Sequence, residues 1–176
     1  MAHDPRGRAA VRSWAPAVLA VLAALLAAPA ARAGCNDPAG AGVDWRRCYQ
    51  DGAELAGHDL SGAALRDATF SRADLSGADL RRADASRAKF LSAKLPRVRF
   101  DEARLTEADF TGADLAGASL VAADLSRARF FRAVLREANL SGATVRGTDF
   151  TRADLSGATW TDGKRVCAEG SIGQCN

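Results

Sequence analysis

Residues 75–90 read LSGADLRRADASRAKF, and a small residue returns in this stretch at every fifth position. Alanine occupies positions 78, 83 and 88, and the residues two positions further on are Leu80, Ala85 and Phe90. An amphipathic helix repeats its apolar residues about every 3.6 positions, and a strand alternates them about every two. A five-residue period fits neither pattern, so the stretch predicts another kind of regular structure.

The same period runs through most of the chain. Between residues 55 and 160, the 22 positions divisible by five hold 13 Leu, six Phe, Ala85, Val145 and Trp160. Two positions earlier, alanine occupies 19 of the 22 sites, and the exceptions are His58, Val98 and Thr148. Continuous repetition with so short a period is typical of a solenoid, in which successive coils stack on one another.

Several units carry a recognisable motif. The units ADLSG (73–77 and 153–157), ADFTG (108–112) and ANLSG (138–142) resemble the A(D/N)Lxx consensus of the pentapeptide-repeat family. The resemblance covers about residues 53–162. It implies an all-β fold, a right-handed quadrilateral β-helix in which four pentapeptides form one square coil, so that 22 units make about 5.5 coils with non-repeat caps at both ends. The resemblance indicates a fold rather than an activity.

A four-sided coil requires positions 20 residues apart to stack, and the sequence contains that longer period independently. One column holds only phenylalanine, at positions 70, 90, 110, 130 and 150. A second holds only leucine, at positions 55, 75, 95, 115, 135 and 155. A period of 15 or 25 residues would mix the two columns.

The outer positions predict charge pairing between coils. Asp67, Arg87, Glu107 and Arg127 form one column of alternating sign. Opposite charges one rung apart attract, so we read such columns as solvated ladders rather than as a binding surface. The aspartates that precede the large residues, such as Asp74 and Asp154, are expected to face solvent.

The first 33 residues have the pattern of a Sec-type signal peptide. Arg6, Arg8 and Arg12 precede an apolar run, and ARA at 31–33 predicts cleavage between Ala33 and Gly34. The apolar run is shorter than the roughly 20 residues that span a bilayer, which disfavours an uncleaved anchor. A lipidated Cys35 is disfavoured by Arg32. The expected location is therefore periplasmic or secreted.

Removing this segment makes the chain neutral. The segment holds four arginines and one aspartate, so 20 basic and 20 acidic residues remain of 24 and 21. A neutral chain suggests neither a surface that neutralises phosphates nor a strongly acidic mimic of nucleic acid.

The four cysteines lie outside the repeats. We predict an N-terminal cap at 34–52, which lacks the pentapeptide rhythm, the β-helix at 53–162 and a C-terminal cap at 163–176. Stacked coils separate the caps by roughly 26 Å, at about 4.8 Å per coil, far beyond the reach of a disulfide. The predicted pairs are therefore Cys35–Cys48 and Cys167–Cys175.

Catalytic chemistry has few candidates. His58, the only histidine after residue 33, occupies an alanine site and is interpreted as a structural residue of a terminal coil rather than as a general base. No phosphate-binding glycine loop and no metal-spaced His/Cys cluster is present in the sequence. We therefore expect no enzyme, no cofactor and no metal site.

One outer column departs from the polar pattern, because Leu91 and Phe131 occupy positions where Ser71, Thr111 and Thr151 are polar. This patch could receive a partner, could be covered by a cap tail, or could be scattered apolar surface. The preferred interpretation of the whole chain is an exported, non-catalytic scaffold or binding module, a monomer or weak dimer with an unidentified protein or surface partner. The alternative is a DNA-mimicking gyrase inhibitor, as in some cytoplasmic members of the family, which the export signal and the neutral charge disfavour.

Overall fold

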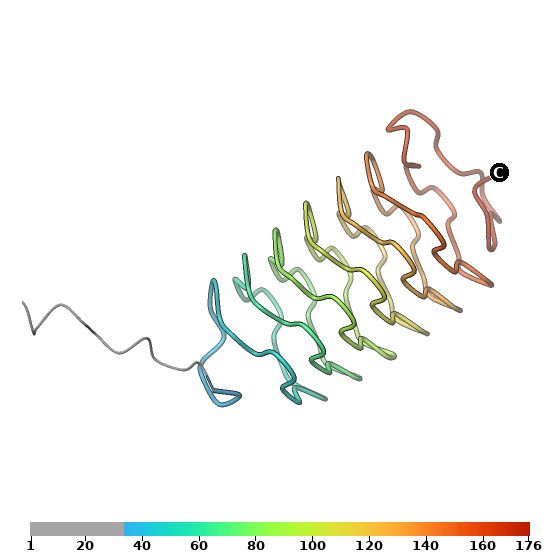
Figure 1. The fold of residues 1–176 in the computed structure, drawn as a ribbon. Helices are drawn as coiled ribbons and strands as arrows, with labels where there is room; N and C mark the ends of the chain where they lie inside the picture. Colours follow the sequence, from blue (N-terminus) through green and yellow to red (C-terminus); the bar gives the residue numbers. More distant parts are fainter. Residues whose placement is uncertain (1–33) are drawn as a thin grey trace, which may run out of the picture. The chain divides into compact units, whose positions relative to one another are not determined.

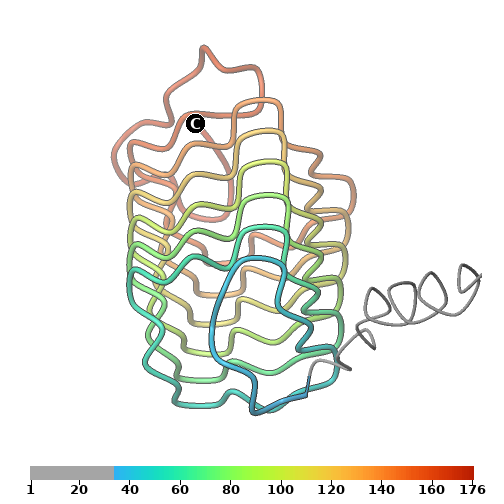
Figure 2. The same ribbon diagram turned by 90° about the vertical axis from the view of Figure 1, so that its left-hand side faces the viewer.

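The computed structural model describes residues 34–176, which form one compact unit. The predicted signal peptide lies outside the described residues. Within 34–176 the chain forms neither an α-helix nor a continuous strand. It pairs instead through single parallel bridges that recur at every fifth residue, from Asp44↔Ala64 to Asn139↔Thr159. Each of these bridges joins residues 20 positions apart, so one coil contains 20 residues and four units. The coils stack on one another along a single axis (Figures 1 and 2).

Each unit turns one corner of the coil. After the large central residue, the chain makes a turn closed by a hydrogen bond from the next alanine N–H to the central carbonyl, as in Ala68 N to Leu65 O at 3.0 Å. The third residue of this turn has a positive φ, for example 60° at Asp67. A type II turn requires such a residue. This backbone requirement explains why glycine recurs two positions after the large residue.

The centre of the coil is filled by the two periodic positions of the sequence. At these two positions, the alanines and the Leu or Phe residues between 60 and 140 are 1% exposed or less. The rings of the phenylalanine column stack nearly parallel, with centroids 4.8 Å apart for Phe90–Phe110 and for Phe110–Phe130. The core is therefore a continuous stack of fully buried side chains from residue 60 to residue 140.

The coil begins earlier than the sequence pattern predicts. Bridges start at Asp44, and the turn pattern is regular from residue 41 to residue 160, so two of the 24 units lie inside the segment 34–52 assigned to the cap. Val43 and Cys48 occupy alanine sites there, and Trp45 takes a central site with 2% of its surface exposed. The consensus letters are absent, yet apolar residues stand at three of the four interior positions of these two units, and the fourth is Gln50. The rest of the cap, residues 34–40, forms no β-bridge with the first coil, and its one backbone hydrogen bond to that coil is the local turn bond from the Val43 N–H to the Gly40 carbonyl.

The other end of the coil is covered by residues that reverse direction. Two antiparallel bridges, Thr159↔Val166 and Asp154↔Ile172, place the C-terminal segment over the last coil. The backbone N–H groups of Leu155, Gly157 and Trp160 donate to this segment. No helix in residues 34–176 has the length and apolarity needed to cross a membrane.

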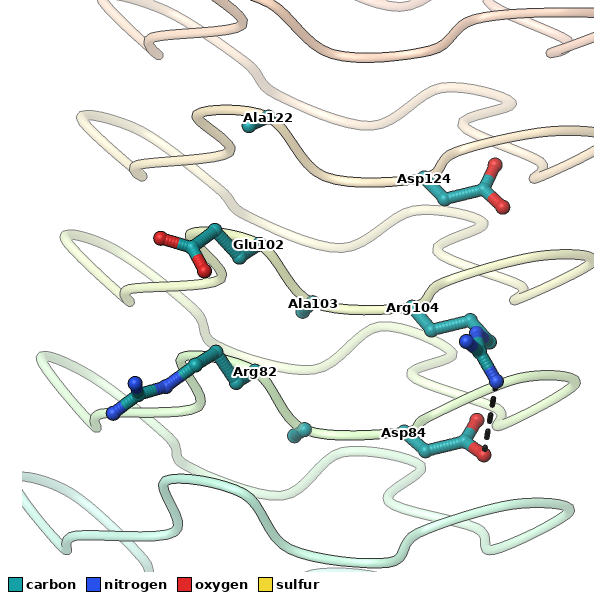
Figure 3. A pocket seen from close by; sticks show the side chains of 8 residues that line it. Arg82, Asp84, Glu102, Ala103, Arg104, Ala122 and Asp124 are labelled. Atoms are coloured by element: carbon teal, nitrogen blue, oxygen red, sulfur yellow. Dashed lines mark ion pairs between the residues drawn. The ribbon is translucent and has the colours of Figure 1, made fainter.

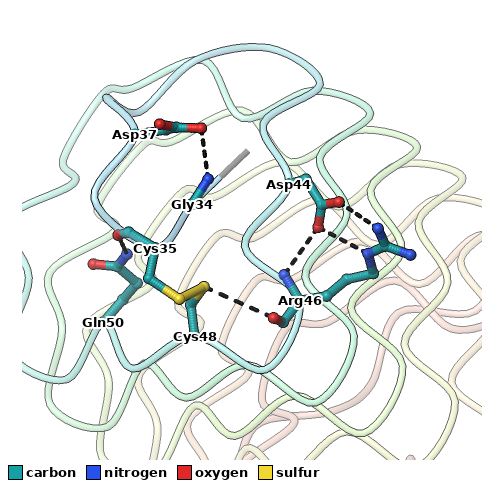
Figure 4. Close-up of a disulfide and its surroundings, with 7 residues drawn as sticks. All are labelled: Gly34, Cys35, Asp37, Asp44, Arg46, Cys48 and Gln50. Carbon is teal, nitrogen blue, oxygen red and sulfur yellow. Dashed lines mark hydrogen bonds and ion pairs between the residues drawn. A yellow bond between two sulfur atoms is a disulfide. The ribbon is translucent and has the colours of Figure 1, made fainter. Parts of the chain in front are cut away.

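Both predicted disulfides are present. Cys35 pairs with Cys48 and Cys167 with Cys175, with Cα atoms 5.3 and 4.8 Å apart. The first holds residues 34–40 beside the first coil, where the Gln50 side-chain amide also donates to the Cys35 carbonyl at 2.9 Å (Figure 4). The second closes the C-terminal cap.

Candidate functional site

The aspartates that precede the large residues have a structural role. Asp74 Oδ1 accepts both the backbone N–H and the hydroxyl of Ser76, at 3.0 and 2.6 Å. Asp154 and Ser156 repeat this arrangement, and Asn139 replaces the aspartate before Ser141. The hydrogen bond from Ser76 holds the pKa of Asp74 below its usual value. These carboxylates reach solvent as expected, but most of them are half-buried and also accept hydrogen bonds from the following turn.

Outer charges form pairs between coils, as the alternating columns indicate. Arg87 Nε lies 2.7 Å from Asp67 Oδ1, and Arg127 lies 2.7 Å from Glu107. The structure adds a diagonal set that the sequence columns do not reveal, in which Arg66 reaches Asp84 at 2.6 Å. Arg136 reaches Asp154 in the same way, also over 18 residues. These exposed pairs contribute little individually, because solvent and salt screen them.

A shallow depression lies across three coils where Ala122 presents only a methyl group (Figure 3). Its charged lining residues are Arg82, Asp84, Glu102, Arg104 and Asp124. Burial acts to raise the pKa of Asp84, but hydrogen bonds from Ser86 and Arg66 outweigh it and the pKa lies below its usual value. The pKa of Asp124 is also lowered, chiefly by its bond with Ser126. Both carboxylates are therefore ionised at neutral pH and hold no proton for acid catalysis.

The remaining catalytic candidate is His58. Its ring is exposed in the first coil, and Nδ1 lies 3.3 Å from the Ala56 carbonyl. The described residues contain no group of three or more His, Cys, Asp or Glu side chains able to hold a metal ion. Neither His58 nor the depression thus assembles a nucleophile with an activating base.

Leu91 and Phe131 lie in one outer column, as the 20-residue register requires, and both are half-buried rather than fully exposed. They stand on the face formed by the units 48–52, 68–72, 88–92, 108–112, 128–132 and 148–152, which we call the phenylalanine face because its interior column is phenylalanine from position 70 onward. Phe131 does not stand alone: the guanidinium carbons of Arg132 and Arg152 lie 5.1 and 5.9 Å from its ring centroid.

The sequence reasoning missed these two arginines. The sequence does indicate that the two arginines lie near the ring, because both are the third residue of a turn in consecutive coils and Arg132 directly follows Phe131. The relation between their side chains and the ring depends on rotamers, which periodicity does not specify.

Comparison with known proteins identifies the repeat. The family model "Pentapeptide repeats" matches in eight copies, over residues 51–82, 63–101, 93–130 and 128–159. No curated protein gives a significant match.

Several solved structures are similar to this chain. HetL, a pentapeptide repeat protein involved in heterocyst differentiation regulation from the cyanobacterium Nostoc, is 33% identical over 70% of this chain and 64% of HetL, with a TM-score of 0.49. A trypsin-treated form of QnrB1, a plasmid-mediated fluoroquinolone resistance protein, is 31% identical over 65% of this chain and 62% of that one, with a TM-score of 0.50. Rfr23 from the cyanobacterium Cyanothece is 31% identical over 53% and 61%, with a TM-score of 0.49. The matches thus span between 61% and 64% of the length of these proteins.

Proposed function

This chain belongs to the pentapeptide-repeat family of right-handed β-helices, and we propose that it acts as an exported, non-catalytic scaffold or binding module. A coil with a buried core presents outer faces whose residues repeat in register every 20 positions, which suits recognition of another surface better than catalysis. The proposed location, periplasmic or extracellular, rests on the signal-like residues 1–33 and on the two disulfides, which persist in oxidising compartments.

The observation that carries the proposal is the pair of apolar residues on the phenylalanine face. Leu91 and Phe131 replace polar residues in an outer column, although the interior of the coil is already filled by the phenylalanines beneath them. Half-buried apolar side chains on an otherwise polar face are a common feature of interaction surfaces.

Crosslinking in intact cells tests this function. We expect the protein to capture a specific partner, and the Leu91→Ser plus Phe131→Ser variant to lose the capture while its thermal unfolding stays cooperative. Val121→Ser is the matched control, because Val121 is another half-buried outer apolar residue but lies outside the phenylalanine face. Equal capture by the wild type and the double variant would exclude this surface. Mature protein found in the cytoplasm after fractionation would exclude export.

A second candidate is a role in fluoroquinolone resistance through gyrase. The similarity to QnrB1 supports it, whereas the balanced charge of residues 34–176 opposes a DNA mimic. Production of the chain without residues 1–33 in a fluoroquinolone-sensitive bacterium tests this candidate. An unchanged minimal inhibitory concentration, with soluble protein verified in the cytoplasm, would dismiss it.

A further inference from the structure

On the phenylalanine face, the third residues of the turns form an outer column whose charges do not alternate, unlike those of the same column on the adjacent face. From the second coil onward it holds Arg72, Ser92, Gly112, Arg132 and Arg152, with no acidic residue. The corresponding column on the adjacent face holds Asp67, Arg87, Glu107 and Arg127, and there each arginine pairs with the acidic residue one coil earlier. Arg132 and Arg152 are therefore stacked like charges.

Neither of these arginines has an ion-pair partner within 4.0 Å among the described residues. The other two charged side chains of units 128–132 and 148–152 already have ion-pair or hydrogen-bond partners. Arg129 lies 3.8 Å from Asp109, and Asp149 accepts the backbone N–H of Thr151 at 2.8 Å. A second pair of basic residues stacked on consecutive coils, Arg46 and Arg66, differs because each binds a carboxylate, Asp44 and Asp84 respectively.

Phe131 orients the two arginines. Both guanidinium groups lie over its ring, and both backbones adopt the left-handed turn conformation, with φ values of 57° and 60°. Successive rungs are separated by about 4.8 Å, so two unneutralised cations are held close together on an exposed surface. Repulsion at this distance is relieved by a shared anion, and the planar guanidinium fork binds a carboxylate through two parallel hydrogen bonds.

We propose that Arg132, Arg152 and Phe131 form a docking site for an acidic segment of a protein partner, with the arginines binding its carboxylates and Phe131 contacting an adjacent apolar side chain. This inference rests on the proposed binding function and specifies the chemistry of the partner. Arginine and aromatic residues are enriched at the energetic centres of protein interfaces. A flat face with two oriented cations suits an extended acidic peptide, which reaches both arginines at once.

Fluorescence anisotropy with defined probes tests the site. The purified protein is titrated into a labelled twelve-residue peptide containing four glutamates and into its counterpart with four glutamines. We expect at least tenfold tighter binding of the glutamate peptide, weakening as salt increases. The Arg132→Gln plus Arg152→Gln variant is expected to lose at least tenfold in affinity. Arg72→Gln is the matched control, because Arg72 has the same turn conformation in the same column but lies three coils below Arg132, away from Phe131; its affinity should change less than twofold.

Equal binding of the two peptides, or an equal loss in the Arg72 control, would overturn the site. So would arginine-dependent binding only to phosphatidylserine vesicles or only to duplex DNA, which identifies a different anionic partner. Thermal unfolding verifies that the variants remain folded. Crosslinking separates the two hypotheses: a double arginine variant that still captures the cellular partner refutes this site alone, whereas a wild type that captures nothing refutes the binding module.

Discussion

Ala85 is the one alanine at a central position, and the phenylalanines beside it explain its size. The coil of residues 81–100 contains both Phe90 and Phe100, whose rings meet edge to face with centroids 5.8 Å apart. Phe100 stands in a column that otherwise holds Leu until Trp160. Ala85, which is fully buried, lies on the side of the coil between these two phenylalanines. The larger ring at position 100 therefore offsets part of the volume that is missing at position 85.

We predict that Ala85→Leu lowers the free energy of unfolding by about 1–3 kcal/mol, because an added side chain in a filled core forces strain. The double variant Ala85→Leu plus Phe100→Leu should recover part of that loss, since removal of the ring releases some of the volume that the added leucine needs. Urea unfolding of both single variants and the double variant measures the coupling. A higher stability of Ala85→Leu alone would indicate an unfilled void instead.

The left-handed turn residue offers a second test at the scale of one side chain. Gly77 has a φ of 65°, and a Cβ built there meets nothing within 4 Å, so Gly77→Ala introduces backbone strain without a steric clash. We expect a loss of about 1–2 kcal/mol. Gly40→Ala is the control, because that site is equally open but lacks the positive φ. An equal loss of unfolding free energy in the two variants would show that the positive φ of the turn is not the cause of the destabilisation.

At the scale of the pentapeptide unit, the bonds to aspartate predict acid sensitivity. The bonds from Ser76 and Thr151 lower the pKa values of Asp74 and Asp149 in the folded state. A carboxylate with a lowered folded pKa stabilises the fold above its unfolded pKa of about 4, and this contribution is lost as the pH falls through the folded value. Urea midpoints should therefore be constant near neutral pH and decrease below about pH 4. Asp74→Asn keeps the oxygen acceptor, as Asn139 does, and should reduce the decrease; an unchanged pH profile would contradict this role.

The sequence predicts those features of the units that repeat and misses those that depend on one neighbour. Alanine and leucine recur because every coil presents the same interior space, and the phenylalanine column reveals the 20-residue register. The first two units are missed because Val43, Trp45 and Cys48 occupy that space without the consensus letters. The diagonal pair Arg66–Asp84 is missed because it depends on the lateral offset between coils. The arginines over Phe131 are missed because side-chain rotamers place them there.

At the scale of the whole molecule, the two ends of the coil differ in how they are covered. The C-terminal segment hydrogen-bonds to the last coil through several backbone groups, whereas residues 34–40 make only one backbone bond to the first coil, the local turn bond from the Val43 N–H to the Gly40 carbonyl. Unpaired backbone at the end of a β structure favours association with other chains. Each disulfide closes a short loop and stabilises the fold. We expect only the C-terminal disulfide to protect against self-association as well.

We predict that Cys167→Ser plus Cys175→Ser lowers the free energy of unfolding by about 2–3 kcal/mol, as expected for a loop of this length. Release of this segment should also uncover the N–H groups of Leu155 and Trp160 and promote self-association, detected by light scattering as a mass that increases with concentration. The matched control is Cys35→Ser plus Cys48→Ser, whose release uncovers no ladder bonds and which should lose stability while remaining at the wild-type mass. Association of both variants, or of neither, would show that the C-terminal segment does not act as the barrier to edge pairing.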